Sequence, residues 1–126
     1  MFCMAFSIRT LTADNDYIAF RNTDHVGAKI AFDVNGVMGG ATLKLWRART
    51  DQDGNIALDY KAPFCLNETQ VEYTVIQAAT IDTANEGFWY IVTLHGATQT
   101  TAINIQYSLP NEDKNVISNI TTVQKI

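Results

Sequence analysis

The sequence contains little that could hold a metal ion or form disulfides. It has only two cysteines, Cys3 and Cys65, without the C-x-x-C spacing of metal and redox motifs. We expect reduced, partly buried thiols, with a disulfide between them as the alternative. A zinc site needs at least three converging nitrogen or sulfur ligands, and beside the two histidines, His25 and His95, the cysteines offer no clustered spacing. No cofactor or metal ion is predicted.

Charge is also sparse. Only 17% of the residues are charged, and the net charge is −4. Because no basic stripe is present to neutralise phosphates, nucleic acid is not an expected partner. No apolar run reaches the length of a membrane span, so a membrane is not expected either. The N-terminus lacks the basic region of a signal peptide, which predicts synthesis in the cytoplasm without one.

Motifs for catalysis are missing as well. No G-x-S-x-G elbow occurs, and the few serines have no motif around them. The acidic segment from Asp51 to Asp59 has its glycine two positions too early for an EF-hand loop. A β-turn is therefore favoured over an ion site in this segment. Together these absences predict a protein that is not an enzyme.

What the sequence does have is alternation of apolar and polar residues with a period of two. Residues 87–108 hold the clearest example. Tyr90, Val92 and Leu94 share one face of a first strand, and Ile103 and Ile105 share one face of a second. The short connection at 96–99 predicts that these two strands form a hairpin around which the rest of the chain packs.

Further strands are predicted upstream. Residues 28–34 and 41–49 are expected to pair with each other, because Asn35 and Gly36 tolerate positive φ and favour a reversal at 35–40. Residues 56–61 alternate in the same way and predict another strand. That strand should end at Pro63, since proline cannot donate to a strand ladder.

The fold class follows from these patterns. A chain of 126 residues is long enough for one hydrophobic core, and no segment has the period of a long helix. We predict an all-β protein, a single antiparallel β-sandwich of immunoglobulin-like or jelly-roll type, with about seven to nine strands over residues 1–110. After Pro110 the alternation is lost, and residues 111–126 are interpreted as a C-terminal extension or interaction arm.

Two resemblances extend this interpretation. Residues 85–94 and 100–109 resemble the last two strands of immunoglobulin-like sandwiches, with an acidic residue and Gly87 ahead of an aromatic-rich strand. The whole chain is small, acidic and rich in Thr and Asn, and it resembles the β-proteins of tailed-phage virions such as capsid decoration (cement) proteins. That resemblance implies a non-enzymatic, often oligomeric subunit of the virion, which clamps capsid subunits with its terminal segments.

Apolar side chains at both ends of the chain are the predicted interaction residues. We expect self-association, for example as a trimer, and docking on a larger capsid-type assembly through these ends. The residues are Phe2, Met4, Phe6, Val116, Ile117, Ile120, Val123 and Ile126.

A glycan is the alternative partner. Trp46 and Trp89 lie on the less apolar face of their strands, so that one of them could be exposed and stack on sugar rings. This pattern predicts a carbohydrate-binding or adhesin-like module, although an exposed tryptophan serves a protein contact equally well.

Overall fold

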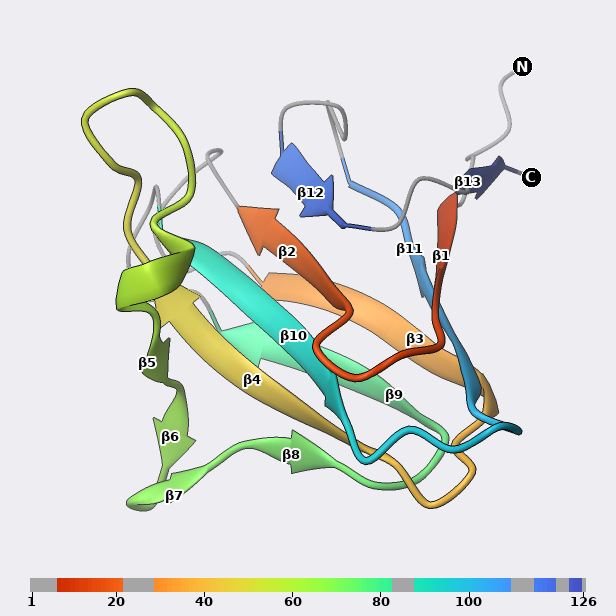
Figure 1. Cartoon of the computed structure of the whole chain (residues 1–126). Helices are drawn as coiled ribbons and strands as arrows, with labels where there is room; N and C mark the ends of the chain where they lie inside the picture. Colours follow the sequence, from red (N-terminus) through yellow and green to blue (C-terminus); the bar gives the residue numbers. More distant parts are fainter. Residues whose placement is uncertain (1–6, 22–28, 83–87, 110–114, 120–122, 126) are drawn as a thin grey trace.

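The protein is an antiparallel β-sandwich in the computed structural model, which describes residues 7–21, 29–82, 88–109, 115–119 and 123–125 (Figure 1). Two sheets of five and six strands pack against each other, which confirms the predicted all-β class. Nine strands have three or more residues, and four more have two residues. The total is therefore somewhat higher than predicted.

The first sheet has the strand order β13-β1-β11-β3-β9. Its strands are Val123–Lys125 (β13), Ser7–Leu11 (β1), Ala102–Tyr107 (β11), Lys29–Val37 (β3) and Gln77–Asp82 (β9). The second sheet has the order β12-β2-β10-β4-β5, with β8 also paired to β4. Its strands are Val116–Ser118 (β12), Tyr17–Arg21 (β2), Trp89–His95 (β10), Thr42–Ala48 (β4), Ala62–Pro63 (β5) and Glu72–Tyr73 (β8). Cys65–Leu66 (β6) and Thr69–Gln70 (β7) form a small hairpin.

The chain changes sheet at almost every step. β1, β3, β9, β11 and β13 lie in the first sheet, and β2, β4, β10 and β12, which alternate with them along the chain, lie in the second. Of the two sandwich topologies predicted, this is the strand order of a jelly roll. In an immunoglobulin-like sandwich the last two strands would pair with each other.

The predicted central hairpin is therefore wrong. β10 pairs with β2 and β4, whereas β11 pairs with β1 and β3 in the opposite sheet. The predicted pairing of 28–34 with 41–49 is wrong for the same reason, since β3 pairs with β11 and β9. Alternation of apolar and polar residues assigns the buried face of each strand but does not indicate which strand pairs with it. Loop length does not indicate it either, because a connection that crosses between the sheets is as short as one within a hairpin.

Two local predictions also need correction. β3 does not reverse at Asn35-Gly36 but continues to Val37, with Gly36 at a φ of 92° opposite Ile103. The reversal comes after it, where the Ala41 N–H donates to the Met38 carbonyl at 3.0 Å.

Residues 56–61 do not form the predicted strand. Ile56 makes only an isolated bridge to Thr50, and Leu58–Tyr60 form a single turn of 3-10 helix (η1). Before this turn, the Asp51 carboxylate accepts the backbone N–H groups of Asp53 and Asn55, both at 2.9 Å. Such side-chain capping of its own backbone is characteristic of an Asx turn. The segment folds back on the second sheet instead of joining it.

The main core lies between the two sheets. Phe20 of β2 stacks on Phe32 of β3, with ring centroids 5.4 Å apart, and meets the edge of Tyr107 of β11 at 5.2 Å. Phe32 also meets Tyr73 of β8 at 5.8 Å. Aromatic pairs in these geometries contribute about 0.5–1.5 kcal/mol beyond their buried area.

A second apolar cluster covers the outer face of the second sheet. Ala19, Ala48, Trp89 and Ile91 are buried there, under partly buried side chains from β2, β4, β12 and the 51–61 segment. These covering side chains are Tyr17, Trp46, Ile56, Leu58 and Ile117. The second sheet is thus apolar on both faces, and β10 is buried along almost its whole length.

The C-terminal residues that the structure describes belong to both sheets. β12 pairs with β2 and β13 pairs with β1, so that each sheet gains a three-residue edge strand (Figure 1). Val116 of β12 is buried in the main core. Within the described ranges, no helix combines the length and apolar character needed to cross a membrane.

Gly36 is the position where the backbone conformation demands glycine most strongly. A Cβ atom there would collide with the Ala102 carbonyl oxygen of the neighbouring strand, and the φ of 92° disfavours any L side chain. Gly36→Ala should lower the free energy of unfolding in urea by about 2–3 kcal/mol. Gly40→Ala is the matched control, because Gly40 also has a positive φ, of 85°, but open space around it. The control should lose only about 1 kcal/mol, and equal losses would contradict the interpretation.

Candidate functional site

Five of the predicted interaction residues lie outside the described residues: Phe2, Met4, Phe6, Ile120 and Ile126. Cys3 and His25 lie outside them too. Val123 lies in β13, opposite Arg9 of β1. Of the two predicted ends, the structure therefore describes only part of the C-terminal one.

Val116 and Ile117 pack against the domain itself. Val116 has 6% of its surface exposed and packs in the main core, while Ile117 is half-buried against the outer cluster of the second sheet. The strand that carries them is held by hydrogen bonds to Tyr17. The Ser118 hydroxyl donates to the Tyr17 carbonyl at 2.9 Å, and the Tyr17 N–H donates to the Asn119 side-chain oxygen at 2.8 Å.

The two tryptophans differ in exposure. Trp89 is 1% exposed, with the Arg21 guanidinium 4.9 Å from its ring centroid, so it offers no stacking platform. Trp46 is half-buried, and the Lys61 ammonium lies 4.8 Å from its ring centroid. The tryptophan nearer to the surface is therefore Trp46.

Trp46 belongs to a polar cluster on the outer face of the second sheet, formed by Trp46, Thr93, His95, Lys44 and Lys61, which we call the Trp46 cluster. The Trp46 indole N–H donates to the Thr93 hydroxyl at 2.8 Å. The Thr93 hydroxyl lies 2.6 Å from Nε2 of His95. Lys44 lies opposite Thr93 on the adjacent strand. An aromatic face beside hydroxyl, imidazole and ammonium groups has the chemistry that binds a polar ring.

The indole fixes the direction of one hydrogen bond in this cluster. Because the indole can only donate, the Thr93 oxygen accepts from Trp46. The Thr93 hydroxyl can still donate to Nε2 of His95 or accept a second hydrogen bond from it, so this contact is compatible with either tautomer. Partial burial lowers the pKa of His95, and the charge of Lys44 lowers it further, against an opposing effect of Asp14. Partial burial and the charge of Lys44 therefore favour neutral His95.

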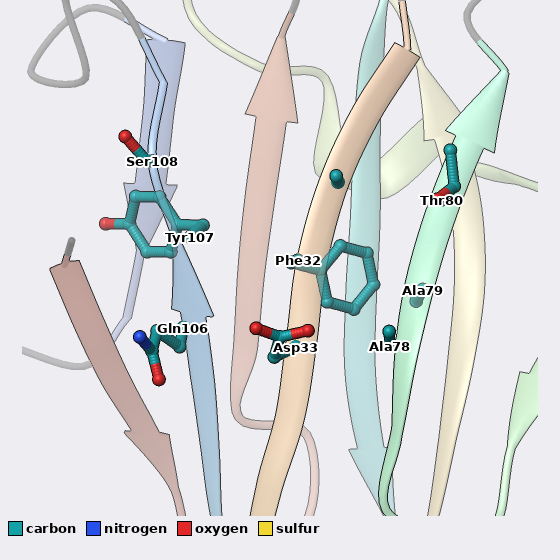
Figure 2. A pocket seen from close by; sticks show the side chains of 9 residues that line it. Phe32, Asp33, Ala78, Ala79, Thr80, Gln106, Tyr107 and Ser108 are labelled. Carbon is teal, nitrogen blue, oxygen red and sulfur yellow. The ribbon is translucent and has the colours of Figure 1, made fainter. Parts of the chain in front are cut away.

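The outer face of the first sheet has a different character. It carries small uncharged side chains such as Thr10 and Asn104, which hydrogen bond to each other at 2.7 Å. A shallow hollow of about 230 Å³ lies where β11, β3 and β9 run side by side. Figure 2 shows Asp33 of β3 there, in register between Gln106 of β11 and Ala78 of β9.

Several large apolar side chains are exposed. They are Val37, Tyr60, Leu66, Val75 and Ile76. The Cys65 thiol is free and exposed beside Leu66, which corrects the expected burial of that thiol. In the described part of the chain, no group of three His, Cys, Asp or Glu side chains is arranged to hold a metal ion.

The fold and these surfaces define the protein as a small jelly-roll β-sandwich. Comparison with protein-family models, curated protein sequences and solved structures gives no significant match. Its function must therefore be argued from its own surfaces.

Sequence alternation placed both tryptophans on the same outer face. Only the cover supplied by the 51–61 segment and β12 explains why one of them, Trp89, is buried.

The neutral state of His95 has a consequence for stability. An unfolded chain binds a proton at this histidine near pH 6.5, whereas the folded protein binds it only at lower pH. The free energy of unfolding should therefore fall as the pH drops below about 6.5, until the folded protein is protonated as well. His95→Gln should show a smaller fall between pH 8 and 5.5 in urea denaturation. The same pH profile for both proteins would contradict the assignment.

Proposed function

We propose that this protein is a non-enzymatic structural subunit that associates with copies of itself and docks on a larger capsid-type lattice, in the manner of a virion decoration (cement) protein. The observation that carries the proposal is the position of the C-terminal strands. They close one edge of each sheet, yet each has only three residues. Jelly-roll sandwiches are also an architecture of viral capsid domains.

Short edge strands are held weakly. Each backbone hydrogen bond contributes a net of about 1 kcal/mol, and a strand of three residues makes few of them. Within the described residues, β13 pairs with β1 through Ser7, Ile8 and Arg9. A strand from a neighbouring copy offers the same backbone groups, so that exchange between subunits changes the free energy little.

Withdrawal of β13 would also open a site for a partner. The edge of β1 would then present unpaired N–H and C=O groups, which are a template for strand addition. β12 is anchored more firmly, because Val116 is buried in the core and Ser118 bonds to Tyr17. We therefore assign the exchangeable contact to residues 120–126 rather than to the whole of residues 111–126.

The outer face of the first sheet supports the same function. Thr10, Asn104 and Gln106 on β1 and β11 present hydroxyl and amide groups without charge. Burying this part of the face against another protein requires little desolvation of ions, and Asp33 on the adjacent β3 carries the nearest charge in register with it. Only 17% of all residues are charged, so burying other parts of the surface also requires little desolvation of ions.

A carbohydrate-binding or adhesin-like module is the second candidate function, and the Trp46 cluster is the observation that favours it. Trp46 is only half-buried, and the groups around it can donate and accept hydrogen bonds. Aromatic stacking combined with such groups is a common way of binding a small polar ligand.

Deleting residues 120–126 tests the structural proposal. We expect the full chain to form a discrete oligomer by light scattering, whereas the shortened protein should remain folded, because β12 keeps Val116 in the core, and should run as a monomer. Replacing the same residues with a Gly-Ser segment of equal length is the control for chain length and should give the same loss. Virus particles purified from the source culture should contain the full chain. A monomeric full chain, or a truncated protein that still associates, would contradict the proposal.

Replacing the partly exposed tryptophan tests the second candidate. If sugar stacks on this ring, Trp46→Ala should reduce retention on a glycan array at least tenfold. Lys44→Gln, which changes the same cluster without removing the aromatic face, should retain most of the binding. A blank array for the unmodified protein at high concentration would exclude this function.

A further inference from the structure

A second hollow, of about 350 Å³, lies at one end of the second sheet. Arg47, Arg49, Tyr60 and Phe88 line it, together with small alanine side chains. We call it the arginine hollow. It is separate from the Trp46 cluster, although both use strand β4.

Local structure explains why these side chains converge. The pairing of β4 with β10 ends at Ala48 opposite Trp89, which leaves Arg49 and Phe88 as the next residues on the two strands. The chain then turns back, and the Ala57 N–H donates to the Arg49 carbonyl at 2.9 Å. This contact brings the η1 turn, with Tyr60, alongside the two arginines.

The described residues do not compensate the positive charge of the hollow. The Arg47 and Arg49 guanidinium carbons lie 5.2 and 5.3 Å from the centroid of the same Phe88 ring, within the range of cation–π contacts. Among the described residues, neither guanidinium has a hydrogen-bond or ion-pair partner. Two like charges held at one ring repel each other, so a bound anion would relieve an unfavourable interaction.

The shape of the hollow restricts the anion. A guanidinium presents its N–H groups as a planar fork that matches a carboxylate bidentately. Tyr60 is 85% exposed and offers an aromatic face and a hydroxyl beside the two forks. The volume lies at the lower end of the range for small-molecule sites, about 300–1,000 Å³. These features fit a ligand of one ring that carries a carboxylate and has an apolar face.

We propose that the arginine hollow binds an acidic monosaccharide unit, such as a uronic or sialic acid. Its carboxylate lies on Arg47 and Arg49, and the apolar face of its ring stacks on Tyr60. A nucleic acid is not the ligand, since two arginines on a chain of net charge −4 cannot follow a phosphate backbone. The site goes beyond the structural function, because it requires no second copy and does not involve the C-terminal strands.

An NMR titration of the full-length protein with sodium glucuronate tests the proposal. Glucuronate should shift the backbone amides of Arg47, Arg49 and Phe88 in a saturable manner, whereas glucose at the same concentration should not. Arg49→Gln should weaken binding at least tenfold. Lys29→Gln is the matched control, because it removes the same charge from an exposed position on β3 of the other sheet, outside both the hollow and the Trp46 cluster, and it should bind as the unmodified protein does. Arg49→Lys should give an intermediate loss, since it keeps the charge but not the fork.

Three results would overturn the proposal. Absence of saturable shifts with both glucuronate and sialic acid would show that no such site exists. Equal affinity for acetate or sulfate would reduce the hollow to an adventitious ion site only. Equal weakening by Arg49→Gln and Lys29→Gln would show that general charge, and not the arginine hollow, attracts the sugar. Because the titration does not depend on the oligomeric state, its failure is distinguishable from failure of the structural proposal.

Discussion

The contact between Phe20, Phe32 and Tyr107 joins the two sheets, and the rest of the fold depends on it. Since successive long strands lie in opposite sheets, they do not hydrogen bond to each other, and each sheet is assembled from strands far apart in the chain. Ladders of this kind form only when the sheets are brought together by their inner side chains. Folding therefore closes long loops before most hydrogen bonds can form, which is typical of slow-folding β-proteins.

The apolar outer face of the second sheet is the next constraint. Trp89 and Ile91 would be exposed there if the 51–61 segment did not fold back and supply Ile56 and Leu58. The same segment carries Tyr60 to the arginine hollow and Lys61 to the ring of Trp46. One loop thus covers a hydrophobic surface and shapes both places where a small ligand could bind.

The two proposed activities use different edges of the second sheet. β12, which leads to the exchangeable C-terminal residues, lies at one edge, and β5, beside the arginine hollow, lies at the other. A subunit that docks through its C-terminal strands would keep the hollow accessible. Assembly and recognition of an acidic sugar are therefore compatible in one small domain.

The sequence by itself determined the all-β class and the inner face of each long strand, because alternation is a local property: Val92, Leu94, Ile103 and Ile105 are all buried as it predicts. The tertiary structure alone decided three further features, because they depend on residues distant in the chain. These are the partner of each strand, the continuation of β3 through Gly36 and the burial of Trp89. The candidate site follows the same division. Arg47 and Arg49 are visible as a basic pair, but Phe88, about forty residues later, joins them only because β4 and β10 pair.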